Sequence, residues 1–289
     1  MWFKSLAAAV LAACAACAGV DVWAQAAPDP TVAELVAKNA SARGGVEAWR
    51  QLQTMVWTGY VESSAQPGVK LPFMLEQQRP QKTRFELMAE GQKSVRVFSD
   101  SDGWKMRASS GGKPELQAYS ADELKFAQGA QVIDGPLMDF AARGSSIALI
   151  GRDELDGHKA YVLEAKTPEG EAHRVWLDAQ TFLELRLDRS FHNSAGRQVL
   201  SSLLYRDYRP FEGLQIAVVV ETGTPSDKAG EKAFNRLVIE RVALNPPLDA
   251  NTFAKPALPA SRHAGGVVVD TRAAATSAPG KAPRPASMQ

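Results

Sequence analysis

Cysteine and an excess of charge are the two features that this sequence most clearly lacks. Its two cysteines, Cys14 and Cys17, lie near the N-terminus, so residues 18–289 contain none. Disulfides, thiol catalysis and cysteine metal sites are therefore excluded from most of the chain. The 33 basic and 32 acidic residues give a net charge of +1. A duplex-binding protein usually has a basic excess, because phosphate neutralisation supplies much of its affinity, so we expect no nucleic-acid partner.

Motifs of the common catalytic sites are also missing from the sequence. No two histidines have the i, i+4 spacing of a helical zinc site, and neither a Gly-x-Ser-x-Gly elbow nor a glycine-rich phosphate loop occurs. The four histidines are His158, His173, His192 and His263. Carboxylate pairs such as Asp153 with Asp156 are expected in solvated hairpin ends. We therefore predict no catalytic residue, cofactor or metal, and a site assembled from distant residues remains the open alternative.

The N-terminus has the pattern of a secretory signal. Lys4 provides a positive charge, Leu6–Val20 is a short apolar run, and small residues follow it. The run is shorter than the ~20 residues that a membrane span requires, and no second run of that length follows. We predict a cleaved signal peptide over residues 1–24 and export to the periplasm. Because Leu-Ala-Ala precedes Cys14, as in a bacterial lipobox, a lipoprotein anchored through Cys14 is the alternative.

Composition divides the remaining chain into a body and a tail. Residues 28–256 contain the mixture of apolar and charged residues that is typical of a folded domain. Residues 257–289 are dominated by Ala, Pro, Ser and Gly. Such a segment buries too little apolar surface to offset its ordering entropy, so we predict a disordered Ala/Pro-rich tail.

Helical patterns occur at the start and in the middle of the body. Thr31 and Glu34 have the spacing of a capping box, and Gly44 with Gly45 follows at the expected end of this first helix. Two further short helices are expected at Ser120–Phe126 and Leu137–Ala142.

Elsewhere, apolar and polar residues alternate with the period of two that half-buried strands require. The clearest case is the run from Leu183 to Asp188, which has one leucine face and one charged face. About ten strands are expected, around residues 54–62, 71–76, 84–87, 94–99, 103–107, 159–166, 172–178, 183–188, 197–206, 214–222 and 233–243. Runs of strands with segregated helices predict an antiparallel α+β architecture.

Several motifs occur in an order that is informative as a set. They are Asn39–Arg50 with the following Thr58-Gly59 strand, Asp102-Gly103-Trp104, Tyr161–Glu164 with Trp176–Thr181, Asp207–Pro210 with Glu212–Leu214, and Leu244–Asp249 with Phe253 and Pro256. Together they resemble the outer membrane lipoprotein-sorting protein-like family, which surrounds the lipoprotein carrier and receptor of the Lol pathway. The resemblance covers about residues 31–256.

The resemblance implies a strongly curved antiparallel sheet that forms an unclosed half-barrel. An N-terminal helix accompanies this sheet, and the central short helices lie across its mouth as a lid. Its concave face is apolar and takes acyl chains, and no residue performs chemistry.

Large apolar side chains of the alternating strands are the candidates for lining such a cavity, with plain core packing as the alternative for each. They are Trp57, Phe73, Phe85, Phe98, Trp104, Tyr161, Leu163, Trp176, Leu185, Leu187, Leu204 and Ile216. The expected lid residues are Leu124, Phe126, Leu137, Met138 and Phe140. For Arg143, at the end of the lid, a plain surface position is favoured over contact with a ligand head group.

Two functions fit these expectations. The favoured one is a non-enzymatic periplasmic carrier that holds lipid or lipoprotein acyl chains in the half-barrel. The alternative is an envelope sensor or scaffold of the same fold, which signals to a membrane protein and uses the tail as a tether. A bound and transferable acyl chain favours the first, and a stable protein complex that depends on residues after Pro256 favours the second.

Overall fold

The computed structural model describes residues 30–108, 114–128, 133–168, 170–192, 195–223 and 234–256. The predicted signal peptide and the predicted tail lie outside the described residues. The chain divides into two compact units, Met1–Phe253 and Ala254–Gln289. The sheet, the helices and the cavity described below all belong to the first unit.

A single antiparallel sheet contains all thirteen strands of the described chain. The strands are β1 (Thr54–Ser63), β2 (Gln66–Gln78), β3 (Lys82–Ala89), β4 (Gln92–Ser99), β5 (Asp102–Ala108), β6 (Pro114–Ala118), β7 (Ser146–Leu155), β8 (His158–Lys166), β9 (Ala172–Asp178), β10 (Glu184–His192), β11 (Gln198–Phe211), β12 (Leu214–Gly223) and β13 (Phe234–Leu244). Their order in the sheet is β6-β5-β4-β3-β2-β1-β13-β12-β11-β10-β9-β8-β7. Strand β13 joins the two halves, because it pairs with β1 on one side and with β12 on the other.

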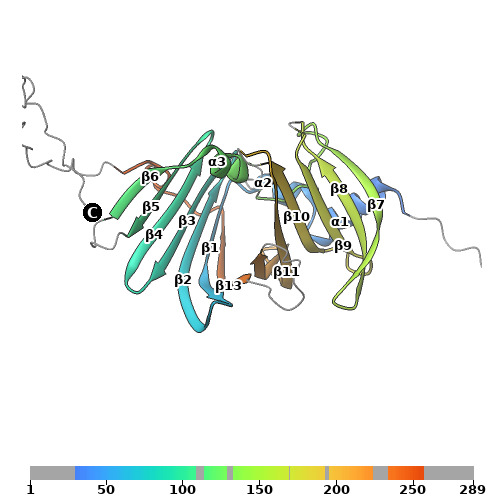
Figure 1. Ribbon diagram of the computed structural model, residues 1–289. Helices are drawn as coiled ribbons and strands as arrows, with labels where there is room; N and C mark the ends of the chain where they lie inside the picture. Colours follow the sequence, from blue (N-terminus) through green and yellow to red (C-terminus); the bar gives the residue numbers. More distant parts are fainter. Residues whose placement is uncertain are drawn as a thin grey trace, which may run out of the picture. The chain divides into compact units, whose positions relative to one another are not determined.

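The sheet curves but does not close, and β6 and β7 are its end strands (Figure 1). The expected α+β class and unclosed antiparallel half-barrel are therefore confirmed. The strands expected from the sequence, about ten in number, did not include β6 or β7. Strand β6 is short and mostly exposed. In β7 the alternation is limited to Ile147 and Leu149, and the second half of the strand is mostly exposed, so the pattern is too short to predict the whole strand.

Three helices accompany the sheet within the described ranges: α1 (Val32–Ala42), α2 (Val46–Gln51) and α3 (Ala121–Gln128). The predicted capping box begins α1. The Thr31 hydroxyl accepts a hydrogen bond from the backbone N–H of Glu34 at 3.2 Å, and the Glu34 carboxylate accepts one from the backbone N–H of Thr31 at 2.8 Å. None of these helices has the length and apolar character needed to cross a bilayer.

The predicted helix over residues 137–142 is wrong, because this segment forms turns. Asp139 has a φ of 51°, a left-handed conformation that a right-handed helix cannot include. Only one turn follows, in which the backbone N–H of Arg143 bonds to the carbonyl oxygen of Asp139 at 3.2 Å. The segment expected to be a lid therefore consists of α3 and an irregular stretch, residues 133–145, which we call the 133–145 loop.

Helix α3 connects the two halves of the half-barrel. From one side, Lys105 of β5 forms an ion pair with Glu123 of α3 at 2.7 Å. From the other side, the guanidinium of Arg189 on β10 lies 4.5 Å from the centre of the Phe126 ring. Seven strands separate β5 from β10 in the sheet order, so contacts of one short helix with both show that it crosses the opening between them. Figure 1 shows α3 between the two groups of strands.

The two faces of the sheet are covered by different parts of the chain. On the face that we call inner, Leu35 of α1 and Leu137 of the 133–145 loop are fully buried against Leu163 and its neighbours. On the opposite face, Phe253 packs against Trp104 and the strand residues around it. The inner face is therefore covered by α1, α2, α3 and the 133–145 loop, which is little material for so long a sheet.

Gly59 provides a test of the β1–β13 pairing. It lies at a register shift between these strands, and a Cβ at this position would overlap the carbonyl oxygen of Val238. We expect Gly59→Ala to lower the free energy of unfolding by about 3 kcal/mol, the upper part of the range for overpacking, as measured by urea unfolding.

Gly151→Ala is the matched control for this substitution. Gly151 also lies beside a register shift, between β7 and β8, but a Cβ there meets no atom within 4 Å. Its effect should stay within about 0.5 kcal/mol. Equal losses for the two variants would contradict the close approach of β1 and β13.

Candidate functional site

A cavity of about 580 Å³ opens on the inner face of the sheet. Strands β9 to β12 provide much of its wall, with contributions from α2, β1, β2 and the 133–145 loop. Its apolar lining comprises Trp49, Trp57, Ile133, Pro136, Ala165, Pro168, Val175, Leu187, Leu203, Ile216, Ala217 and Val220. Its polar lining includes Arg43, Gln77, Arg143, His173, Glu184, Arg189, Tyr205 and Tyr208. The cavity thus has the size and the mainly apolar wall of a small-molecule site, with several charged groups added.

Arg43, at the end of α1, lines the cavity and connects the elements around it. Its Nη1 donates to the carbonyl oxygen of Asp134 at 2.5 Å and to the carboxylate of Glu184 at 3.1 Å. Its guanidinium lies 4.2 Å from the centre of the Trp49 ring. Its own carbonyl oxygen accepts hydrogen bonds from the indole N–H of Trp49 at 3.0 Å and the backbone N–H of Gln215 at 3.1 Å. One residue therefore joins α1 to α2, the 133–145 loop, β10 and β12.

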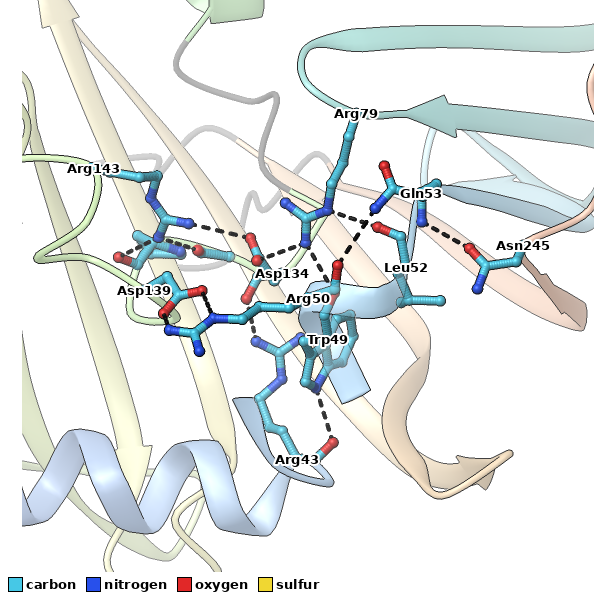
Figure 2. A network of polar contacts seen from close by, with 12 residues as sticks. Arg43, Trp49, Arg50, Leu52, Gln53, Arg79, Asp134, Asp139, Arg143 and Asn245 are labelled. Atoms are coloured by element: carbon cyan, nitrogen blue, oxygen red, sulfur yellow. Dashed lines mark hydrogen bonds and ion pairs between the residues drawn. The ribbon is translucent and has the colours of Figure 1, made fainter. Parts of the chain in front are cut away.

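Asp134 attaches the 133–145 loop to the rest of the molecule (Figure 2). Its side chain is 2% exposed and lies between two arginines. The carboxylate accepts from Arg79 at 2.8 Å and from Arg143 at 3.3 Å. Arg79 also donates to the carbonyl oxygens of Leu52 at 2.7 Å and Trp49 at 3.1 Å. The buried carboxylate thus holds the loop against α2 and the end of β2.

Arg143 is not the plain surface arginine that the sequence predicted. It lines the cavity, its ion pair with Asp134 is partly buried, and it also donates to the carbonyl oxygens of Gly135 and Pro136. Burial lowers the pKa of its guanidinium.

A second, more exposed pair reinforces the loop, because Arg50 donates to both carboxylate oxygens of Asp139 at 2.7 and 2.5 Å. These hydrogen bonds hold the pKa of Asp139 below its ordinary value.

A second polar group lies on β9, β10 and β11. His173 and Arg189 are direct neighbours across the β9–β10 pair. Burial, with a smaller contribution from the charge of Arg189, lowers the pKa of His173 to about 4, so its imidazole is neutral at neutral pH. Burial also raises the pKa of Tyr205 to about 12 and that of Tyr208 well above its ordinary value. Both phenols therefore keep their protons, and the hydroxyl of Tyr208 donates to the carbonyl oxygen of Glu184 at 3.0 Å.

Three of the twelve residues predicted to line a cavity lie along this one: Trp57, Leu187 and Ile216. Five others pack in the core of the sheet and are not among the residues that line the cavity. Phe73 and Phe85 belong to one core cluster, Tyr161 and Leu163 to another, and Phe98 is 1% exposed. Contact of any of these residues with a ligand stays a prediction.

The other four predicted residues lie on the opposite face of the sheet. Trp104 packs with Phe253, and Trp176 packs with Leu185. Leu204 pairs with Arg186, whose guanidinium lies 4.6 Å from the centre of the Trp176 ring. The cause in β10 is a register shift between Glu184 and Arg186. This irregularity turns Glu184 into the cavity and Leu185 away from it, which reverses the faces that simple alternation assigns.

The five predicted lid residues are also separated by the structure. Leu137 and Met138 of the 133–145 loop are buried in two core clusters. Leu124 and Phe140 are partly buried, and Phe126 is exposed to 38% beside Arg189. Their role as a lid stays a prediction.

The sequence interpretation missed the polar residues of the cavity. Arg189 continues the inward-facing alternation of Leu187, and His173 continues that of Val175 and Leu177. A charged or polar residue at a position that alternation assigns to the inner face was therefore the available signal. No such signal exists for Arg43, which comes from the end of a helix. Within the part of the chain that the structure describes, no group of three or more His, Cys, Asp or Glu side chains could hold a metal ion.

Comparison with known proteins gives matches to solved structures. A DUF1329 family protein from Desulfovibrio piger is 14% identical, with 75% of this chain and 96% of that chain covered and a TM-score of 0.50. A LolA superfamily protein from Nitrosomonas europaea is 11% identical, with 78% and 99% covered and a TM-score of 0.49. A putative outer membrane lipoprotein-sorting protein domain from Vibrio parahaemolyticus is 13% identical, with 76% and 94% covered and a TM-score of 0.48.

Neither a family model nor a curated protein matches this chain. The structural likeness is at low identity and shows the fold alone. At that level, the predicted LolA-like half-barrel is confirmed.

Asp134 is expected to be essential for holding the 133–145 loop. We predict that Asp134→Asn lowers the free energy of unfolding by about 3 kcal/mol, because it leaves two partly buried arginines without their counter-charge. Urea unfolding measures the loss. Asp139→Asn is the control, since it weakens an exposed pair in the same loop and should cost less than about 1 kcal/mol. Similar losses for both variants would show that burial of Asp134 does not govern the loop.

His173 should give the folded protein a specific dependence on pH. Its pKa of about 4 in the folded state lies below the ordinary value of 6.5, so its contribution to stability is complete above pH 6.5 and is lost as the pH falls toward 4. The expected loss is on the order of 3 kcal/mol in total.

Urea unfolding at several pH values tests this dependence. In His173→Leu the free energy of unfolding should vary much less between pH 6.5 and pH 4 than in the wild type. The expectation fails if the His173 variant has the wild-type pH profile.

Proposed function

We propose that this protein is a non-catalytic binding protein that holds the acyl chain of a lipid or of a lipidated protein in its half-barrel cavity. The observation that carries the proposal is the 580 Å³ cavity on the inner face, with its apolar wall from β9 to β12 and helix α3 across the opening. Helix α3 contacts both halves of the sheet through the side chains of Glu123 and Phe126, and we expect it to move when a ligand enters.

The apolar wall is sufficient to bind a chain without a specific polar contact. Leu187, Leu203 and Val220 present aliphatic surface to the cavity, with Trp57 beside them. Each methylene group that leaves water for such a surface contributes about 0.8 kcal/mol. Several buried methylenes therefore give a useful affinity, and the ligand can still leave because no covalent or metal bond holds it.

The polar groups of the cavity support binding rather than catalysis. A general base needs a nucleophile or substrate within reach and a partner that orients it. Nδ1 of His173 is buried and has no hydrogen-bond partner among the described residues, and the His173 pKa of about 4 makes it a weak base. Glu184 is engaged by Arg43 and Tyr208. Neither arrangement prepares a residue for proton transfer.

We place the protein in the bacterial periplasm, on the basis of the predicted signal peptide, with a lipid or a lipidated protein as its partner. The same fold serves the alternative of an envelope sensor that contacts a membrane protein. The experiment below separates the two, because only the binding function requires the cavity to accept an acyl chain.

Tryptophan fluorescence offers a direct test, since Trp49 and Trp57 line the cavity and Trp104 and Trp176 pack on the opposite face. A bromine-labelled long-chain alcohol, which is neutral, should quench part of the emission. Trp57→Phe should reduce the quenched fraction, and Trp176→Phe, the matched control, should leave the quenching amplitude unchanged. Equal changes for both variants would mean that the chain binds elsewhere.

A cavity-filling variant provides the second arm of this test. Ala217 lines the cavity, so Ala217→Phe should weaken binding of the same probe at least tenfold. Ala243 is exposed on β13, and Ala243→Phe should bind as the wild type does. Thermal unfolding confirms that each variant is folded. Absence of quenching in the wild-type protein would remove the binding function and favour the sensor.

A further inference from the structure

The charges around the cavity do not balance. Among its lining residues are three arginines, Arg43, Arg143 and Arg189, and one carboxylate, Glu184. Arg43 pairs with Glu184 at 3.1 Å, and Arg143 pairs with Asp134 at 3.3 Å. Within the described ranges, no carboxylate lies at ion-pair distance from Arg189, and the charge of Glu171 acts on it only from farther away. One cation of the cavity is thus without a direct ion-pair partner.

Unpaired polar atoms occur around the same arginine. Nε of Arg189 and Nδ1 of its neighbour His173 are buried, and neither has a hydrogen-bond partner among the described residues. The indole nitrogen of Trp57 and the amide oxygen of Gln77, farther along the cavity wall, are in the same situation. A buried polar group without a partner is unfavourable. A ligand that brings an acceptor to Arg189 removes part of this penalty.

The surroundings of Arg189 suit an anion with an apolar chain. Tyr205 remains a neutral phenol and presents an O–H donor to the same cavity. The adjoining apolar wall comes from Leu187, two residues before Arg189 on β10, and from Leu203 of β11, which pairs with Leu187. Phe126 of α3 lies over the guanidinium at 4.5 Å. Arg189 is therefore at the lid end of an aliphatic surface.

The volume of the cavity is sufficient for one acyl chain. A methylene group needs about the room of a water molecule, whose share of liquid volume is about 30 Å³. A cavity of about 580 Å³ then holds roughly twenty such groups. This is enough for one long acyl chain with its head group.

We propose that the cavity binds a single-chain amphiphile with an acidic head group, whose carboxylate or phosphate oxygens pair with Arg189 beneath α3 and whose chain lies along Leu187 and Leu203. This inference rests on the proposed function, because it assumes that the cavity takes an apolar chain. It adds the chemical class of the ligand and the residue that selects it. Hydrogen bonds between charged groups in such a partly buried site are stronger than neutral ones, so the acid is preferred over a neutral analogue.

Three probes of equal chain length test the proposal with the full-length protein after lipid extraction: hexadecanoic acid, hexadecyl phosphate and hexadecanol. Calorimetry at mildly alkaline pH, where both acids are ionised, gives their affinities. The wild-type protein should bind at least one acid about tenfold to a hundredfold more tightly than the alcohol. The stronger of the two acids identifies the head group as carboxylate or phosphate.

Arg189→Gln should abolish the preference for the acid and change the affinity for the alcohol by less than about threefold. Arg189→Lys, which keeps the charge, should retain part of the preference. The matched control is Arg174→Gln: this arginine lies on β9, directly across from Asp188, and is mostly exposed outside the cavity. Arg174→Gln should preserve the wild-type affinities for the acid and for the alcohol.

The thermal unfolding midpoint separates a ligand-binding role of Arg189 from a structural one. Removal of a buried charge that has no direct ion-pair partner should leave the midpoint of the ligand-free Arg189→Gln variant unchanged or raise it. A lower midpoint would mark Arg189 as a structural residue and would overturn the proposal.

The remaining outcomes are equally informative. Equal binding of acid and alcohol by the wild type overturns the head-group site and leaves acyl-chain binding intact. Inorganic phosphate that competes with the acids as well as hexadecyl phosphate does would show a simple anion site and would also overturn the proposal. If none of the three amphiphiles binds, the proposed function itself fails.

Discussion

The rest of this structure depends on the buried guanidinium of Arg43. It lies where α1 ends, and its side chain and carbonyl oxygen contact α2, β10, β12 and the 133–145 loop. A guanidinium suits this position because its several N–H donors have fixed directions and its flat face can lie against the Trp49 ring. These contacts add polar connections to the apolar packing of Leu35 and Trp49 against the inner face. Arg43 thus joins the helices and the 133–145 loop to β10 and β12, two of the strands that border the cavity.

An open half-barrel with few helices leaves an apolar face that is incompletely covered, and the charges near it must then be paired within the molecule. Two buried carboxylates, Glu184 and Asp134, accept from three arginines, of which Arg79 belongs to the end of β2. Burial of a paired charge is tolerated, whereas burial of an unpaired one is costly. Arg189 differs from the others in this respect. Its contact with Phe126 places this guanidinium beside the helix that crosses the opening, so the proposed head-group site and α3 share a side-chain contact.

The strands and the first helix could be predicted because their signals are local. Thr31 and Glu34 are three residues apart, and the cap that they form depends on nothing else in the chain. The cavity wall could be predicted only in part, because a single irregularity changes the face of every residue beyond it. Leu185 and Leu187 are two residues apart and would share a face in a regular strand, yet the register shift before Arg186 separates them. Trp176 has the same face as Val162 and the opposite face from Leu163, and only the strand register reveals this.

The sequence by itself determined the antiparallel α+β class, the α1 cap and the resemblance to half-barrel proteins, since alternation and capping act over a few neighbouring residues. The tertiary structure alone decided which side chains meet in the cavity. Arg43, Arg143, Glu184 and Arg189 come from a helix end, a loop and one strand, and Arg43 and Glu184 are 141 positions apart in the sequence. Their charges interact because the curved sheet brings these segments together and excludes water from between them. Electrostatic pairing depends on distance and burial, and neither quantity is encoded in the spacing of residues along the chain.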